Sequence, residues 1–240
     1  MKCVWLAGII IAVLFTQTAS THWIAREVKG YEVEGRVVLS GGVKGEAARD
    51  ASKVVEWLAP LDSSAASSQG RRSYEMIQRD KRFDPELLVV PKGSVVTFPN
   101  LDPWFHNVFS LYRGKRFDLG LYQAGDSKSV RFDRLGPSYI FCNIHPHMAA
   151  VILTIDSNYF GLSDKSGRVK ISDVPAGKYG LNVWYQNADA EALEALQRDV
   201  VVDGDRELPT ISVAVVLHDL RDHKNKYGKD YDTGALSPNY

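Results

Sequence analysis

Between Tyr74 and Asp156 the chain alternates short apolar segments with glycine- and proline-bearing breaks. The segments are residues 75–82, 87–90, 94–98, 107–111, 128–132, 139–142 and 149–155. Segments of this length are short for helices, and turn residues at close spacing are typical of antiparallel sandwiches. We therefore predict that the chain is all-β, with residues 74–157 forming one sandwich domain.

Strand-like segments also flank this domain on both sides. They are residues 33–39 and 53–58 before it, and 168–171, 178–185, 199–202 and 210–217 after it, with a helix-forming stretch at 189–197. The stretches VVEWL and SDKSGRVKISDVPAGKYGLNVW resemble parts of a carboxypeptidase regulatory-like sandwich. The resemblance implies that residues 31–62 and 158–217 pair as one discontinuous, small Ig-like β-sandwich. Residues 63–73 are then a linker into the inserted domain.

The two ends of the chain differ from this β pattern. A charged start, the apolar run VWLAGIIIAVLF and the small-residue stretch TQTAS predict a signal peptide over residues 1–20 and a periplasmic protein. The alternative is an uncleaved membrane anchor. Residues 218–240 are polar, and we expect a solvated tail in which His218 and His223 bind no metal. Lysine plus arginine equals aspartate plus glutamate at 29 each, which argues against nucleic acid as a partner.

Removal of the signal peptide leaves a single cysteine, Cys142. An unpaired cysteine in an oxidising compartment needs burial or a metal. Cys142 lies in YIFCNIHPHMA, together with His145, His147 and Met148, and His106 lies upstream in FPNLDPWFHNVFSL. A thiolate, two imidazoles and a thioether suit copper. Alternation along the chain allows only one of His147 and Met148 to face a metal comfortably.

These residues resemble the type I copper site of cupredoxins, and the spacing C-x-x-H-x-x-M is similar to the amicyanin ligand loop. The wider pattern also resembles bacterial cupredoxin-like proteins labelled as methylamine-utilisation proteins. The resemblance implies a Greek-key cupredoxin β-sandwich that holds one copper ion, cycling between Cu(I) and Cu(II). The implied ligands are His106, Cys142, His145 and Met148, with His147 as the other axial candidate. Asn107 is implied to join the two ligand segments by hydrogen bonds.

We expect from this site a one-electron carrier in the periplasm. Its partner would be a redox protein such as a cytochrome, an oxidase or a dehydrogenase, with no stable membrane span after signal cleavage. We expect no enzyme activity, because a copper oxidase or reductase needs a further, open copper site with more histidines. Pro103, Trp104, Phe105 and Pro146 are candidates for an apolar docking rim. The alternative is a copper reservoir or sensor without a carrier role.

Overall fold

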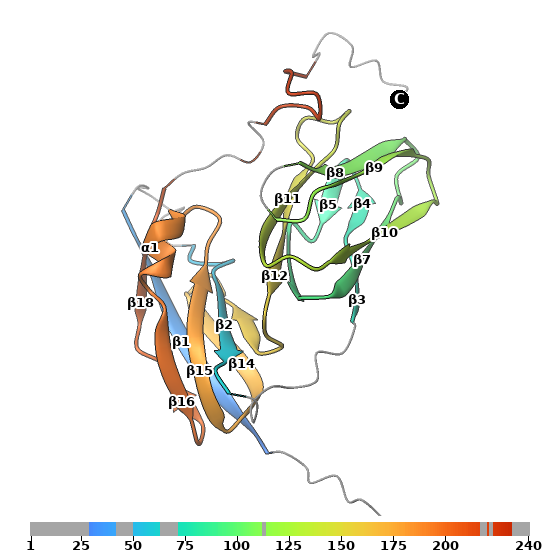
Figure 1. Cartoon of the computed structure of the whole chain (residues 1–240). Helices are drawn as coiled ribbons and strands as arrows, with labels where there is room; N and C mark the ends of the chain where they lie inside the picture. Colours follow the sequence, from blue (N-terminus) through green and yellow to red (C-terminus); the bar gives the residue numbers. More distant parts are fainter. Residues whose placement is uncertain are drawn as a thin grey trace, which may run out of the picture.

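A computed structural model of the chain describes residues 29–41, 50–62, 72–111, 114–216, 220 and 223–231. Strands make up nearly all of its regular structure, which confirms the all-β prediction, and they form two bodies side by side (Figure 1). The predicted signal peptide and residues 63–71 of the predicted linker lie outside the described residues. Within the described part, no helix is long and apolar enough to cross a membrane.

The first body is a sandwich built from the middle of the chain. Its strands are β3 (Ser73–Glu75), β4 (Ile77–Arg79), β5 (Arg82–Asp84), β6 (Leu87–Pro91), β7 (Ser94–Pro99), β8 (His106–Ser110), β9 (Phe117–Tyr122), β10 (Ser127–Phe132), β11 (Gly136–Phe141) and β12 (Ala149–Ile155). One sheet has the order β6-β12-β11-β8-β9 and the other β10-β7-β3. Phe98 and Phe132 from one sheet and Ile140 and Ile152 from the other share one buried cluster.

The segment predicted as a single strand over residues 75–82 is interrupted. A turn at Asp80 and Lys81, both with φ of +54°, separates β4 from β5. Two consecutive residues with positive φ are typical of tight hairpin turns, which match the twist of the flanking strands. Because Asp tolerates this conformation but Lys does not favour it, the local sequence did not reveal the turn.

The second body is built from both flanks. Its elements are β1 (Gly30–Ser40), β2 (Val55–Pro60), β13 (Phe160–Leu162), β14 (Arg168–Pro175), β15 (Gly177–Trp184), α1 (Ala190–Glu194), β16 (Arg198–Val202), β17 (Arg206–Glu207) and β18 (Ile211–Ala214). β1 pairs with β14, β17 and β18, and β2 pairs with β13 and β15. Among the described strands, β1 and β2 therefore pair only with strands that follow residue 159.

Strand β12 joins the two bodies because it is buried on both faces. Ala150 and Ile152 lie in the core of the first body, whereas Val151, Leu153 and Ile155 lie in the cluster formed by the second body. A strand buried on both faces reads as a continuous apolar run, as AAVILTI does. The two bodies therefore share buried apolar surface.

Candidate metal centre

Three donor atoms converge at one end of the first body. His106 begins β8, Cys142 follows β11, and His145 lies in the turn between β11 and β12. The two Nδ1 atoms are 3.1 Å apart, and Cys142 Sγ lies 3.6 Å from His145 Nδ1 and 3.9 Å from His106 Nδ1. Donors that share one ion lie about 2.0–2.3 Å from it, and so at most about 4.6 Å from each other. These three distances fit a single metal ion.

The protonation states of the two histidines also suit metal binding. Burial lowers the pKa of His106. Burial, followed by the nearby His106 ring, lowers the pKa of His145 to about 4. Both rings are therefore neutral at pH 7 and keep a lone pair for a metal. A thiolate with two imidazoles is a donor set that suits copper better than hard cations such as Mg²⁺ or Ca²⁺.

The Cys142 sulfur lies in a nest of backbone donors. Burial raises the pKa of the Cys142 thiol, while the backbone N–H groups of Asn107, Ile144 and His145 bond to the sulfur and lower it. These N–H groups stabilise the thiolate charge that a metal would also stabilise. The sulfur therefore has donors in place for its ionised form.

Two backbone hydrogen bonds close the turn that carries His145. The N–H of Cys142 donates to the carbonyl of Met148 at 3.2 Å, and the N–H of Met148 donates to the carbonyl of His145 at 3.1 Å. Met148 is fully buried in the same cluster as Cys142, whereas His147 is exposed. The turn thus directs Met148, rather than His147, to the interior.

Asp102 orients the first histidine and was missed by the sequence analysis. This buried carboxylate lies 2.7 Å from His106 Nε2 and also accepts the backbone N–H groups of Asp80 and Lys81. A carboxylate only accepts hydrogen bonds, so Nε2 carries the proton and Nδ1 presents its lone pair to Cys142 and His145. The available signal was an acidic residue four positions before His106.

Asn107 forms hydrogen bonds to both β9 and the Cys142 segment. Its side-chain amide donates to Asp118 on β9 at 2.8 Å, and its buried Oδ1 has no hydrogen-bond partner among the described residues. Its backbone N–H is the group that reaches the Cys142 sulfur. The connection between His106 and Cys142 therefore runs through the main chain, while the side chain ties β8 to β9.

Part of the polar tail packs on the ligand turn instead of being solvated. We call residues 223–231 the C-terminal strap. Tyr231 donates its hydroxyl to the carbonyl of Cys142 at 2.8 Å, and the Lys226 N–H donates to Asn143 Oδ1 at 3.0 Å. The Lys226 ammonium also pairs with Asp118 at 2.8 Å. His218 and residue 222 lie outside the described residues.

His223 belongs to the strap, which corrects its expected place in solvent. Its ring stacks on Phe141, with centroids 4.0 Å apart, and Nδ1 lies 3.2 Å from the Tyr231 hydroxyl. Composition alone does not predict this packing, because the groups of the strap that bond to the turn are polar and would be equally at home in solvent.

The expected apolar rim is partly at the surface. Phe105 is 49% exposed and Leu101 is 50% exposed, in the loop that leads to His106. Trp104 is half-buried beneath the Lys81 ammonium, which lies 4.6 Å from the centre of its ring. His145 is 9% exposed, so its outer edge reaches solvent.

Neither family models nor curated proteins match the chain. Among solved structures, a purple cupredoxin from Nitrosopumilus maritimus is 23% identical over 34% of this chain and 99% of its own, with a TM-score of 0.32. A reduced mutant of amicyanin is 16% identical over 42% of this chain and 98% of its own, with a TM-score of 0.33. A Cu-containing nitrite reductase from Thermus scotoductus is 18% identical over 50% of this chain and 28% of its own, with a TM-score of 0.34.

Proposed function

We propose that the chain binds one copper ion through His106, Cys142, His145 and Met148 and carries single electrons in the periplasm. The observation that supports this proposal most directly is the buried triangle of two imidazole nitrogens and one sulfur. The His106 Nδ1 lone pair, His145 Nδ1 and the Cys142 sulfur surround one position that a single cation can occupy. When bound, copper would supply the Cu(I)/Cu(II) couple, and the Met148 thioether would tune its potential.

The residues around the triangle keep the donors in place. Asp102 fixes the His106 ring, and the backbone bonds of Cys142 and Met148 close the ligand turn. A donor set held in this way needs little rearrangement when the charge at its centre changes by one. Burial of the donors also excludes water from the position they surround. These features favour electron transfer over copper delivery, which needs an accessible metal.

A carrier must also exchange electrons with another protein. The exposed edge of His145 and the apolar surface at Phe105 and Leu101 support docking of a redox protein such as a cytochrome, an oxidase or a dehydrogenase. In the described part of the chain, His106, Cys142 and His145 are the one cluster of this kind that suits a metal. We propose a carrier role for this cluster.

Two substitutions test the site. Cys142→Ser should erase the intense visible absorption of the copper-thiolate bond, while Met148→Leu should keep the colour and shift the reduction potential. His147→Ala is the matched control and should change neither. A band that survives Cys142→Ser would disprove the assignment. Fast electron exchange with a redox partner, without loss of copper to an apo-acceptor, separates a carrier from a reservoir or sensor.

A further inference from the structure

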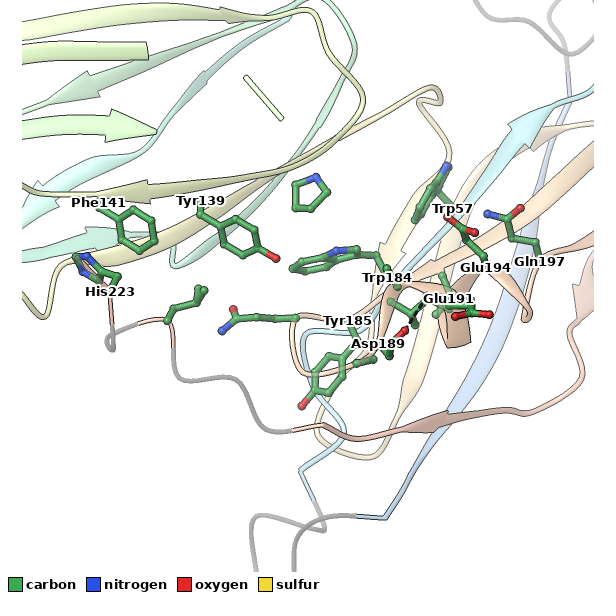
Figure 2. Close-up of a pocket in the computed structure, with 17 residues that line it drawn as sticks. Trp57, Tyr139, Phe141, Trp184, Tyr185, Asp189, Glu191, Glu194, Gln197 and His223 are labelled. Carbon is green, nitrogen blue, oxygen red and sulfur yellow. Dashed lines mark hydrogen bonds between the residues drawn. The ribbon is translucent and has the colours of Figure 1, made fainter. Parts of the chain in front are cut away.

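A cavity of ≈ 920 Å³ lies between the two bodies, and none of the three donor residues lines it. Aromatic side chains from both bodies line it: Trp57, Tyr139, Phe141, Trp184 and Tyr185. Figure 2 shows Tyr139 and Phe141 on β11 facing the cavity from one side and Trp184 from the other. Cavities of this size at domain boundaries are common sites for small molecules.

The aromatic walls are held in place by the fold. Phe141 is 3% exposed and Trp184 is 9% exposed, so packing fixes both rings. The indole N–H of Trp57 donates to Asp156 at 3.0 Å, which orients a third ring. A ligand would therefore meet ring faces that are already arranged, with little ordering cost.

The charges that line the cavity have one sign. Asp189, Glu191 and Glu194 contribute carboxylates from α1 and the residue that caps it, and none of the described lining residues is lysine or arginine. Glu191 and Glu194 are three positions apart, so their side chains share one face of the helix. Electron-rich ring faces beside carboxylates attract positive charge.

We propose that this interdomain cavity binds a small organic cation, a protonated amine or a quaternary ammonium compound. Cation–π contact with the rings would supply selectivity for positive charge, and the carboxylates would reinforce it. An anion would be repelled, and a neutral apolar molecule would gain nothing from Glu191 and Glu194. The proposal does not rest on the copper function.

The cavity adjoins the metal centre through one strand. Tyr139 and Phe141 face the cavity, whereas Ile140 and Cys142 lie in the core of the first body. The His223 ring stacks on Phe141, so a cation in the cavity would instead contact Tyr139, three residues before Cys142. Binding should therefore be visible both in tryptophan fluorescence and as a shift of the copper band.

The test compares two molecules of the same shape. Choline and its uncharged analogue 3,3-dimethyl-1-butanol are titrated into the copper-loaded protein and followed by tryptophan fluorescence and calorimetry. Choline should bind about tenfold more tightly than the alcohol. Glu191→Gln with Glu194→Gln should weaken choline about threefold and leave the alcohol unchanged. Glu207→Gln, a change of an exposed carboxylate on β17, is the matched control and should affect neither.

Trp184→Phe links the signal to the cavity. This variant should remove most of the fluorescence response while calorimetry still detects choline. Equal affinity for choline and the alcohol, or no saturable choline binding, would overturn the proposal. The same titration on copper-free protein gives the result independently of the copper site, so failure here leaves the proposed function standing.

Discussion

At the scale of single residues, Asp102 decides which nitrogen of His106 a metal can reach. Both of its oxygens are in use, one by the Asp80 N–H and the other by Lys81 and His106. Asp102→Asn replaces an acceptor with an amide N–H donor at one of these positions. We expect copper affinity to fall about 10- to 100-fold, measured by competition with a chelator. Asp126→Asn, at an exposed position, should leave it unchanged; equal affinities for both variants would contradict the role of Asp102.

Glu56 is a second residue whose environment has a measurable consequence. It is fully buried in the second body, and neither carboxylate oxygen has a hydrogen-bond partner among the described residues. Its side chain occupies the space beside Gly35 where a Cβ would collide with Glu56 Oε2. Burial, partly offset by Arg198, raises the pKa of Glu56 from 4.5 to about 7.

This raised pKa predicts that the contribution of Glu56 to stability falls as pH rises. Between pH 4.5 and about 7 the folded chain keeps a proton on Glu56 that the unfolded chain releases, so the Glu56 contribution to the free energy of unfolding falls across this range. The loss amounts to about 3 kcal/mol and persists above pH 7. Glu56→Gln should match the wild type in urea unfolding at pH 4.5 and exceed it by about 3 kcal/mol at pH 8. A difference independent of pH would exclude this explanation.

The residues of the metal centre divide into those with a local signal and those without one. His106, Cys142 and His145 lie in short motifs with a recognisable order, and the structure brings them together. Asp102 and Tyr231 contact the same centre, yet their roles depend on tertiary folding. Tyr231 lies 89 positions from Cys142, so no sequence spacing links the two.

At the scale of elements, the C-terminal strap adds contacts to the ligand turn from outside the sandwich of the first body. Tyr231 and Lys226 bond to the two successive residues Cys142 and Asn143. Tyr231→Phe removes the hydrogen bond to the Cys142 carbonyl while keeping the ring. We expect copper to dissociate about threefold to tenfold faster, because the turn loses a net contribution of about 1 kcal/mol.

The measurement is the rate at which a chelator removes copper and bleaches the visible band. Tyr227→Phe is the matched control, since Tyr227 lies in the same strap and is 70% exposed. If both variants release copper at the wild-type rate, the strap does not hold the turn. The strap was unpredictable from composition, because its residues are polar both in a solvated tail and against the turn.

Element prediction succeeded where one face of a strand is buried and failed where a turn depends on a distant group. Short apolar segments between turn residues identified β7 and β10, whose inner residues Val96, Phe98 and Phe132 are buried. The turn between β4 and β5 was missed because the Asp102 carboxylate holds its N–H groups from another loop.

At the scale of the whole molecule, β1 and β2 pair with strands that follow residue 159. That residues 31–62 and 158–217 form one discontinuous domain with residues 74–157 inserted stays a prediction. The two bodies share buried side chains. Leu153 and Ile155 of β12 are buried with Leu58 and Tyr179 of the second body. Shared burial of this kind couples the stability of the two bodies, because unfolding one exposes apolar surface of the other.

The coupling predicts that copper loading protects the second body. A ligand that binds only the folded state stabilises every part that unfolds with its site. Hydrogen exchange of peptides from β2 and β15 should therefore slow on copper loading, although neither strand carries a proposed ligand.

Leu153→Ala, at a side chain 1% exposed, should lower the free energy of unfolding by about 3 kcal/mol and reduce this protection. Ile152→Ala is the matched control on the opposite face of β12. It should destabilise the first body and leave the interface residues in place. Unchanged exchange in β2 and β15 on copper loading would show that the two bodies unfold independently despite their shared core.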